Sequence, residues 1–133
     1  FENRNYPLKN INKAIKHYNL AGEKGMLDAQ YNLGLIYYNG ELVKKNYKKS
    51  FKWFEIAANQ GDGASQYSLA LHYFRGQGVS QNIDKALKYL DAAVKQNIRE
   101  AIILMSYEYL VGEIIRKNHN KGIALLKRAI YGN

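Results

Sequence analysis

A histidine and a carboxylate in this sequence have the residue types of a general base and the group that orients it. His72 and Glu108 lie 36 residues apart, at the same position of two successive sequence repeats, so neighbouring helices could bring them together. A base held by a carboxylate is half of a catalytic set. Because no nucleophile or second carboxylate joins the pair, we expect a hydrogen bond at the protein surface and assign no catalytic residue.

Metal and cofactor chemistry finds no support in the sequence. His17 and His119 do not share the repeat register of His72, which argues against a histidine metal site. The chain contains no cysteine, so thiolate ligands, a thiol nucleophile and a disulfide framework are excluded, and the redox compartment is left open. The loop Gly76-Gln77-Gly78 follows a predicted helix rather than a strand and lacks the lysine and hydroxyl residue of a phosphate loop. We therefore predict no cofactor and no metal.

The side chains best suited to binding are apolar and aromatic residues on one stripe of three predicted helices. In the first of these helices, positions 31, 35 and 38 lie on a different side from the core stripe that begins at Ala29. An exposed aromatic surface of this extent usually means binding; the alternative is that these residues pack between repeats. With polar ends at Arg75 and at Asp28 or Glu100, the predicted partner-binding groove consists of Tyr31, Leu35, Tyr38, Tyr67, Leu71, Phe74, Arg75 and Tyr107.

These side chains are positioned by a repeated unit of 36 residues. The stretch from Asp28 to Gly61 aligns without a gap with residues 64–97 and again with residues 100–133. The columns shared by the three units include Leu33, Leu69 and Met105, then Tyr37, Tyr73 and Tyr109, then Gly40, Gly76 and Gly112, then Ala57, Ala93 and Ala129. A period in this range that combines helical spacing with a fixed glycine indicates a solenoid repeat.

Each unit is predicted to form two antiparallel helices. The first helices are expected over about 28–39, 64–75 and 100–111, and the second over about 11–23, 47–59, 83–95 and 119–131. Each first helix ends at a glycine of the column above, which can adopt the left-handed conformation that terminates a helix. Each second helix follows an asparagine that can cap its free amides. These asparagines are Asn10, Asn46, Asn82 and Asn118.

The two ends of the chain depart from this unit. Residues 1–9 contain Pro7 and no helical periodicity, so we predict an extended lead-in. Residues 10–25 match only the second half of the unit, which predicts a half repeat before the full repeats 28–61, 64–97 and 100–133. In the last unit Gly122 stands inside the predicted second helix, where glycine costs roughly 1 kcal/mol relative to alanine. We therefore predict that this unit is the least stable or an atypical end.

At these columns the chain resembles the Sel1-like repeat, a relative of the tetratricopeptide repeat. The matching residues are Ala29, Tyr31, Leu33, Gly34, Tyr37, Gly40, Val43, Lys49, Ser50, Trp53, Phe54, Ala57, Ala58 and Gly61, followed by Leu69, Tyr73, Gly76, Gly78, Val79, Lys85, Ala86, Tyr89, Ala92 and Ala93. The period exceeds the roughly 34 residues of a tetratricopeptide unit, and the proline expected near the end of that unit is missing. The resemblance covers residues 10–133, and its third unit departs most. It implies a right-handed all-α solenoid of about three and a half units whose concave side, lined by first helices, binds a protein partner.

The net charge of +9 arises from 20 lysine and arginine residues against 11 acidic residues. Across the three first-helix windows Arg75 is the only basic residue, so the lysines fall on the second helices and the loops. We interpret them as a solvated outer face, and the alternative is a basic convex face that binds nucleic acid or an anionic surface. The even spacing of the lysines argues against that alternative.

Together these features predict one domain over residues 1–133, a fragment or end of a longer array, that acts as a non-enzymatic scaffold or adaptor for a protein or peptide. The resemblance implies a bacterial role in secretion, the envelope, host interaction or immunity. No apolar run approaches the roughly 18 residues that span a bilayer, so we expect a soluble protein. The chain starts at Phe1 rather than methionine, which is consistent with removal of a targeting signal and leaves the compartment open. The end helices could also stack into oligomers.

Overall fold

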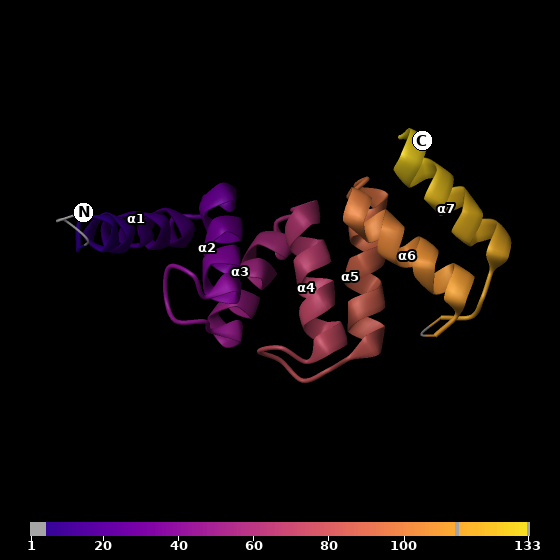
Figure 1. Ribbon diagram of the computed structural model, residues 1–133, viewed down its shortest axis with the longest axis horizontal. Helices are drawn as coiled ribbons and strands as arrows, with labels where there is room; N and C mark the ends of the chain where they lie inside the picture. The colour runs from indigo at the N-terminus through magenta and orange to yellow at the C-terminus, as the bar shows by residue number, and fades with distance from the viewer. Residues whose placement is uncertain (1–4, 114, 133) are drawn as a thin grey trace.

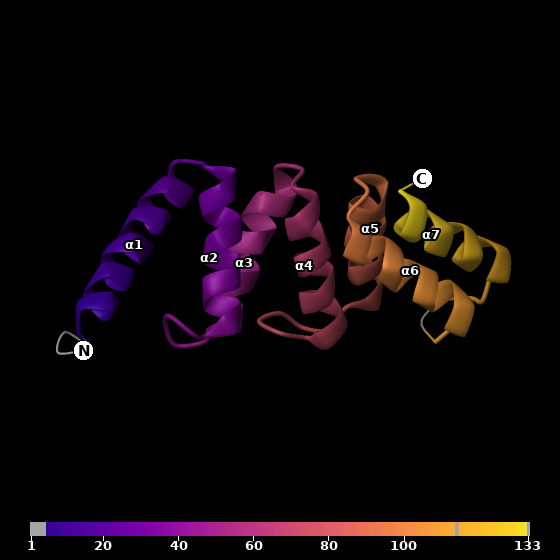
Figure 2. The ribbon, with the colours of Figure 1, turned by 45° about the horizontal axis from the view of Figure 1, so that its top comes forward.

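The computed structural model describes the backbone of residues 5–113 and 115–132, with side chains from Asn10 onward. Within these ranges the chain forms seven helices and no strand. They are α1 (Asn5–Glu23), α2 (Leu27–Asn39), α3 (Tyr47–Asn59), α4 (Gly63–Arg75), α5 (Ile83–Lys95), α6 (Arg99–Val111) and α7 (His119–Tyr131). The helices follow one another along the long axis in chain order, with the chain ends at opposite ends of the molecule (Figure 1 and Figure 2). The all-α solenoid of antiparallel helix pairs is confirmed.

The predicted helix ends are formed by the expected capping residues in all three full units. The side-chain oxygens of Asn46, Asn82 and Asn118 accept hydrogen bonds from the amide three residues later, at 3.0, 3.0 and 3.1 Å. Each bond satisfies one of the free amides at a helix start and contributes on the order of 1 kcal/mol. The first helices end at glycines with left-handed φ values of 69°, 66° and 70°, at Gly40, Gly76 and Gly112. No helix among the described residues is long and apolar enough to cross a membrane.

The N-terminal helix differs from the sequence prediction. α1 begins at Asn5, so the predicted extended lead-in is wrong for residues 5–9. Residues 1–4 of that lead-in lie outside the described part of the chain. Pro7 falls in the first helical turn, where its missing amide hydrogen costs no intrahelical bond. Because the helix starts earlier, Asn10 lies inside it and does not cap a helix start, unlike the other three asparagines of its column.

The apolar core is a row of clusters between neighbouring helices rather than one centre, as expected for a solenoid. The core stripe of the first helices is buried, with Leu33 and Leu69 fully inaccessible. One cluster, the N-terminal core cluster, consists of Phe54, Ala58, Leu69, Tyr73 and Ala86. A second, the C-terminal core cluster, consists of Ala70, Leu90, Ala93, Val94, Ala101, Ile102, Met105 and Ala129.

Within each repeat the two helices meet at a pair of small residues. In the first repeat the hydroxyl of Ser50 donates to the carbonyl of Gly34 at 2.7 Å. In the third repeat the roles are exchanged, because the hydroxyl of Ser106 donates to the carbonyl of Gly122 at the same distance. A Cβ atom at position 122 would lie 2.6 Å from a side-chain carbon of Leu110. The glycine inside α7 is therefore required for the close approach of α6 rather than being only a helix defect.

Glutamine side chains link successive repeats, and the sequence analysis did not identify them. The last carbonyls of a helix lack intrahelical partners. In the first junction Gln30, only 2% exposed, donates from Nε2 to the carbonyl of Gly22 at 3.0 Å and accepts from Gln60 at 2.5 Å. In the second junction Gln66 donates to the carbonyl of Ala58 at 3.5 Å and accepts from Gln96 at 2.9 Å. The buried amides therefore satisfy the C-terminal end of each preceding second helix.

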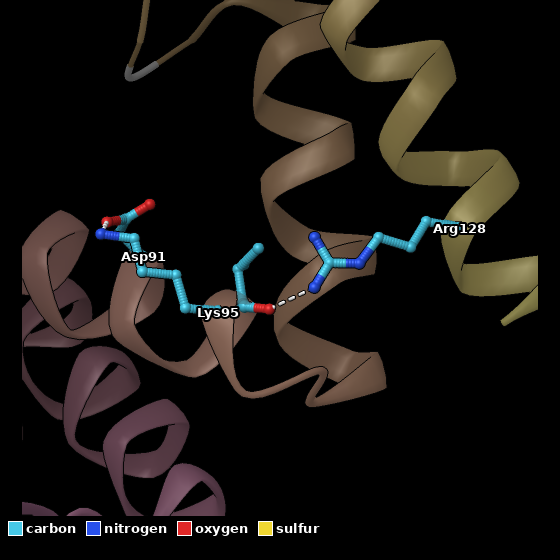
Figure 3. A network of polar contacts seen from close by, with 4 residues as sticks. Asp91, Lys95 and Arg128 are labelled. Atoms are coloured by element: carbon cyan, nitrogen blue, oxygen red, sulfur yellow. Dashed lines mark hydrogen bonds and ion pairs between the residues drawn. The ribbon is translucent and has the colours of Figure 1, made fainter. Parts of the chain in front are cut away.

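An arginine replaces the glutamine in the third junction, where Ile102 occupies the corresponding position. Arg128 of α7 donates from Nη2 to the carbonyl of Val94 at 2.6 Å, and Figure 3 shows it reaching to the C-terminal end of α5. The exposed ion pair of Lys95 with Asp91, at 3.1 Å, lies nearby. Such an exposed pair contributes only about 0.3–0.5 kcal/mol, and it lies within α5, whereas Arg128 spans the junction.

Candidate functional site

The histidine that the sequence analysis placed at the surface is buried. His72 is 1% exposed, and its Nδ1 lies 2.7 Å from the backbone carbonyl oxygen of Gln77. Because a carbonyl oxygen only accepts, Nδ1 carries the proton and Nε2 faces the hydroxyl of Ser50 at 3.3 Å. Glu108 is also buried, at 4% exposure. The expected surface hydrogen bond between His72 and Glu108 is therefore wrong, because position 72 points toward the preceding helix α3 and its own loop.

His72 is a packing residue in an aromatic environment. Its ring centroid lies 5.5–5.9 Å from those of Tyr38, Phe51 and Phe54. Burial lowers the pKa of His72, and the charge of Arg75 lowers it further, although the bond to Gln77 acts in the opposite direction. The imidazole is therefore held neutral in the fold. His72 therefore contributes a hydrogen bond and packing, and its neutral ring also forms part of the lining of the hollow between α2 and α4.

The described residues contain no group of three or more histidine, aspartate or glutamate side chains placed to hold a metal ion. The Gly76-Gln77-Gly78 loop also has a structural role. Gly76 ends α4 with a left-handed φ, and a Cβ atom at Gly78 would collide with the backbone carbonyl of Tyr47. These glycines turn the chain closely over the neighbouring repeat.

The predicted binding stripe forms a hollow between α2 and α4. Its volume is about 210 Å³, and its lining includes Leu35 and Tyr38 from α2 and Leu71 and Arg75 from α4. The buried side chains of Phe54 and His72, 2% and 1% exposed, also line the hollow. The walls are mainly apolar, and the guanidinium of Arg75 is the one cationic group that lines them. The structure thus brings four of the predicted site residues together.

Arg75 is held in place at this hollow by a short chain of hydrogen bonds. Its Nη1 donates to the hydroxyl oxygen of Tyr38 at 2.9 Å. That hydroxyl donates in turn to the side-chain oxygen of Gln77 at 3.1 Å. Gln77 is itself tied through its backbone carbonyl to His72. A surface arginine is thereby fixed by neutral partners, and none of the described carboxylates forms an ion pair with it.

A second hollow lies between α4 and α6. It has a volume of about 340 Å³ and is lined by Tyr67 from α4 and by Glu100, Ile103, Leu104 and Tyr107 from α6. Ile103 is 47% exposed and Tyr107 is 49% exposed, so both present apolar surface to solvent. Tyr107 is one of the predicted groove residues, and Ile103 occupies the register position of Tyr31 and Tyr67 in the third repeat.

The remaining members of the stripe are half-buried and contribute to the core. The ring of Tyr31 lies 5.8 Å from that of Phe54, and Phe74 packs against both core clusters. Burial raises the pKa of Tyr31 and Tyr67, and the negative charge of Glu100 raises it further. Their hydroxyls therefore remain neutral hydrogen-bonding groups near pH 7. Tyr31, Tyr67 and Phe74 therefore take part in packing between repeats, which was the alternative to a binding role.

The lysines of the second helices are engaged with the aromatic column. The ammonium groups of three of them lie over tyrosine rings of their own repeats, at 5.3, 5.7 and 5.6 Å from the ring centroids. These pairs are Lys49 over Tyr37, Lys85 over Tyr73 and Lys121 over Tyr109. Such contacts stabilise the helix pair, so this lysine column has a packing function within each repeat.

A third hollow was not predicted from the sequence. It lies among α1, α2 and α3, has a volume of about 620 Å³, and is lined by residues that include Tyr37, Lys52 and Trp53. In the next repeat Tyr73 and Tyr89 stack, with centroids 5.9 Å apart and an interplanar angle of 6°. The aromatic residues at these positions can be read from the repeat register. The hollow itself could not be predicted from the sequence, because it depends on how α1 and α3 are placed.

Comparison with known proteins identifies the repeat. The family model of the Sel1 repeat matches residues 3–26, 27–62, 63–98 and 99–133. No curated protein matches the sequence.

Several solved structures are similar to this fold, each with 26% sequence identity. One is a protective antigen present in uropathogenic Escherichia coli strains, with a TM-score of 0.85 over 92% of this chain and 26% of that chain. A Sel1 repeat protein from Oxalobacter formigenes has a TM-score of 0.76 over 88% of this chain and 54% of that chain. Helicobacter pylori cysteine rich protein B has a TM-score of 0.63 over 68% of each chain. The present chain therefore spans only about a quarter and about half of the first two proteins.

Proposed function

Because this chain belongs to the Sel1 repeat family, whose members are in general protein-interaction scaffolds, we propose that it is a non-enzymatic adaptor. It binds a peptide segment of a protein partner along the groove formed by α2, α4 and α6. This groove is defined by the hollow between α2 and α4, which includes Tyr38 and Arg75, and the hollow between α4 and α6, which includes Ile103 and Tyr107.

The observation that carries this proposal is the exposure of Ile103 and Tyr107 beside a shallow hollow. Their side chains stand on α6, whose buried face packs in the C-terminal core cluster, so the helix holds them in place without their taking part in the core. Large apolar side chains on a rigid element, next to a cavity, are typical of binding hot spots. The rest of the groove is half-buried and supports these residues.

A bacterial role toward a host is the cellular setting that we propose. The protective antigen with a similar fold comes from uropathogenic bacterial strains, and the other two similar structures are also bacterial proteins. The repeat implies a role in secretion, the envelope, host interaction or immunity. Of these four roles, the similar structures support host interaction. The partner in this setting is a protein or peptide rather than a nucleic acid.

The proposal is tested by recovery of the partner with two double variants that change the same residue types. Ile103→Ser with Tyr107→Ser removes the exposed apolar surface of the groove. Ile130→Ser with Tyr131→Ser is the matched control, because these residues are 57% and 76% exposed on α7, outside the groove. We expect a pull-down from the native source to lose its partner with the first variant only, while circular dichroism shows equal helicity.

Two results would contradict the proposal. Equal recovery of the partner by wild type and both variants would remove the groove as the binding surface. Recovery of nucleic acid alone, released by moderate salt, would instead assign binding to the basic residues of the second helices.

A further inference from the structure

We infer that the groove takes an acidic, apolar peptide segment, in which a carboxylate binds Arg75 and a neighbouring apolar side chain fills the hollow between α2 and α4. This inference rests on the proposed function and specifies the chemistry of its partner. It is drawn from the juxtaposition of one fixed cation with an apolar cavity, and from the charges along the rest of the groove.

The position of Arg75 is set before any partner arrives. Tyr38 accepts from the guanidinium, and Gln77 accepts from Tyr38, so the arginine is tied to the loop that follows its own helix. An arginine held in this way loses less conformational freedom on binding than a free surface side chain does. The chain of bonds therefore preorganises a cation at the rim of the apolar hollow.

Arg75 also retains donors for an external carboxylate. Among the described residues it bonds to a neutral hydroxyl through Nη1 alone, and no carboxylate there pairs with it. A guanidinium can present two parallel N–H groups to one carboxylate, and such pairs are stronger than neutral hydrogen bonds. The net charge of +9 adds a long-range attraction for an acidic segment. The apolar walls of Leu35 and Leu71 then favour a hydrocarbon side chain next to that carboxylate.

The charge in the hollow between α4 and α6 determines which end of the peptide segment lies there. Its charged lining residue is Glu100, which lies beside the exposed Ile103 and Tyr107. A carboxylate of the partner would be repelled there, whereas a neutral or basic residue is accepted. The preferred segment therefore has its acidic residue over Arg75, apolar residues in both hollows, and a neutral or basic residue beside Glu100. The apolar lining and the carboxylate of Glu100 disfavour a phosphate backbone in the same groove.

The probe that we would use is a phage-displayed library of short random peptides, selected on the wild-type protein. We expect enrichment of aspartate or glutamate next to leucine or phenylalanine. A synthetic copy of an enriched peptide and its amide version, with Asp→Asn or Glu→Gln, would then be compared by fluorescence polarisation. The amide version should bind at least about tenfold more weakly, as expected for loss of a charge-assisted bond.

Variants of the protein connect this preference to Arg75. Arg75→Gln should lower affinity for the acidic peptide at least about tenfold and leave affinity for the amide peptide nearly unchanged. Tyr38→Phe keeps the ring but removes the hydroxyl that holds Arg75, so a smaller loss with the same specificity is expected. Arg99→Gln is the matched control, because it makes the same charge change at an exposed residue that does not line either hollow of the groove.

The outcomes separate this inference from the proposed function. Peptides that bind wild type and are lost with the Ile103→Ser/Tyr107→Ser variant, but respond neither to Arg75→Gln nor to amidation, would overturn the inference and keep the groove. An equal loss of affinity with Arg75→Gln and Arg99→Gln would show that the preference for acidic peptides reflects net charge alone. That result would also overturn the inference. Peptides that bind all variants alike, or no enrichment on wild type, would count against both.

Discussion

At the residue scale, His72 is a catalytic residue type with a structural role. Its two ring nitrogens face Gln77 and Ser50, and aromatic rings surround it. A buried imidazole without partners would be costly, but the bond from Nδ1 to Gln77 and the packing of the surrounding rings allow it to sit in the core as a neutral group. Gln77 also links His72 to Tyr38 and Arg75, which line the hollow between α2 and α4.

We predict that the fold loses stability as the pH falls below about 6.5, the ordinary value for an unfolded histidine. The pKa of His72 is lowered in the folded protein, mainly by burial. Between the unfolded and folded pKa values the unfolded chain binds a proton that the folded chain does not, so the free energy of unfolding decreases with acidification. Chemical denaturation at a series of pH values, in wild type and His72→Gln, measures this change.

The comparison isolates His72, because His17 and His119 are exposed and remain in both proteins. Glutamine can still donate to the Gln77 carbonyl but does not titrate. The stability of the His72→Gln variant should therefore be flatter between about pH 7.5 and 5 than that of wild type, in the window set by the histidine value of about 6.5. Parallel curves for the two proteins would contradict the assignment.

At the element scale, the separation of paired helices is set by which small residue faces which large one. Gly34 of α2 packs against Phe54 of α3, and a Cβ atom at position 34 would lie 2.5–2.7 Å from three ring carbons. In the next repeat the corresponding residues are Ala70 and Leu90, both buried in the C-terminal core cluster. Glycine in α2 therefore faces an aromatic ring in α3, whereas alanine in α4 is matched with the smaller side chain of leucine in α5.

We predict that Gly34→Ala destabilises the protein by up to about 2 kcal/mol, because overpacking a core usually costs about 1–3 kcal/mol. This cost exceeds the roughly 1 kcal/mol that alanine gains over glycine in a helix, because the ring of Phe54 is 2% exposed and has little room to move. Chemical denaturation of Gly34→Ala, Phe54→Leu and the double variant measures the coupling.

In the Phe54→Leu background the ring that the added methyl group at position 34 would meet is gone, as in the second repeat. The Gly34→Ala substitution should then cost less than it does in wild type, which gives a coupling free energy of the order of 1 kcal/mol or more. An equal cost in both backgrounds would show that the contact with Phe54 does not set the helix separation.

At the scale of the whole molecule, burial is concentrated in the middle of the array. α4 buries residues along its whole length, from Gly63 to Tyr73, because it is packed between α3 and α5. α7 buries only Gly122 and Ala129 among its described side chains, and Ile130 is 57% exposed. Because the stability of a solenoid is roughly a sum over repeats and their interfaces, it should decrease from the centre toward both ends.

We predict that native-state hydrogen exchange will show the slowest amides in α4 and α5 and the fastest in α1 and α7. Helices with fewer buried neighbours open locally at a lower free energy, so their amides exchange first. Exchange followed by mass spectrometry on peptic fragments resolves the individual helices. Uniform protection across all the described helices would instead indicate one cooperative unit.

The sequence by itself determined the repeat, its helices and most of their ends. These features depend on local physics: a 36-residue register, apolar stripes at helical spacing, capping asparagines such as Asn46, and left-handed glycines such as Gly40. Local signals failed at the N-terminus, because a proline in a first turn looks the same in sequence as one in an extended segment. α1 therefore starts earlier than the repeat pattern indicates.

Tertiary structure alone decided which polar residues face solvent and how the predicted groove is divided. The position of His72 in the register does not reveal that Ser50 and Gln77 enclose it, since those contacts depend on the packing of α3 and on the path of a loop. Likewise, the stripe on the first helices is continuous in sequence, yet Tyr31 packs inward while Tyr107 stays exposed. The difference depends on contacts between helices, such as that of Tyr31 in α2 with Phe54 in α3, rather than on residue type alone.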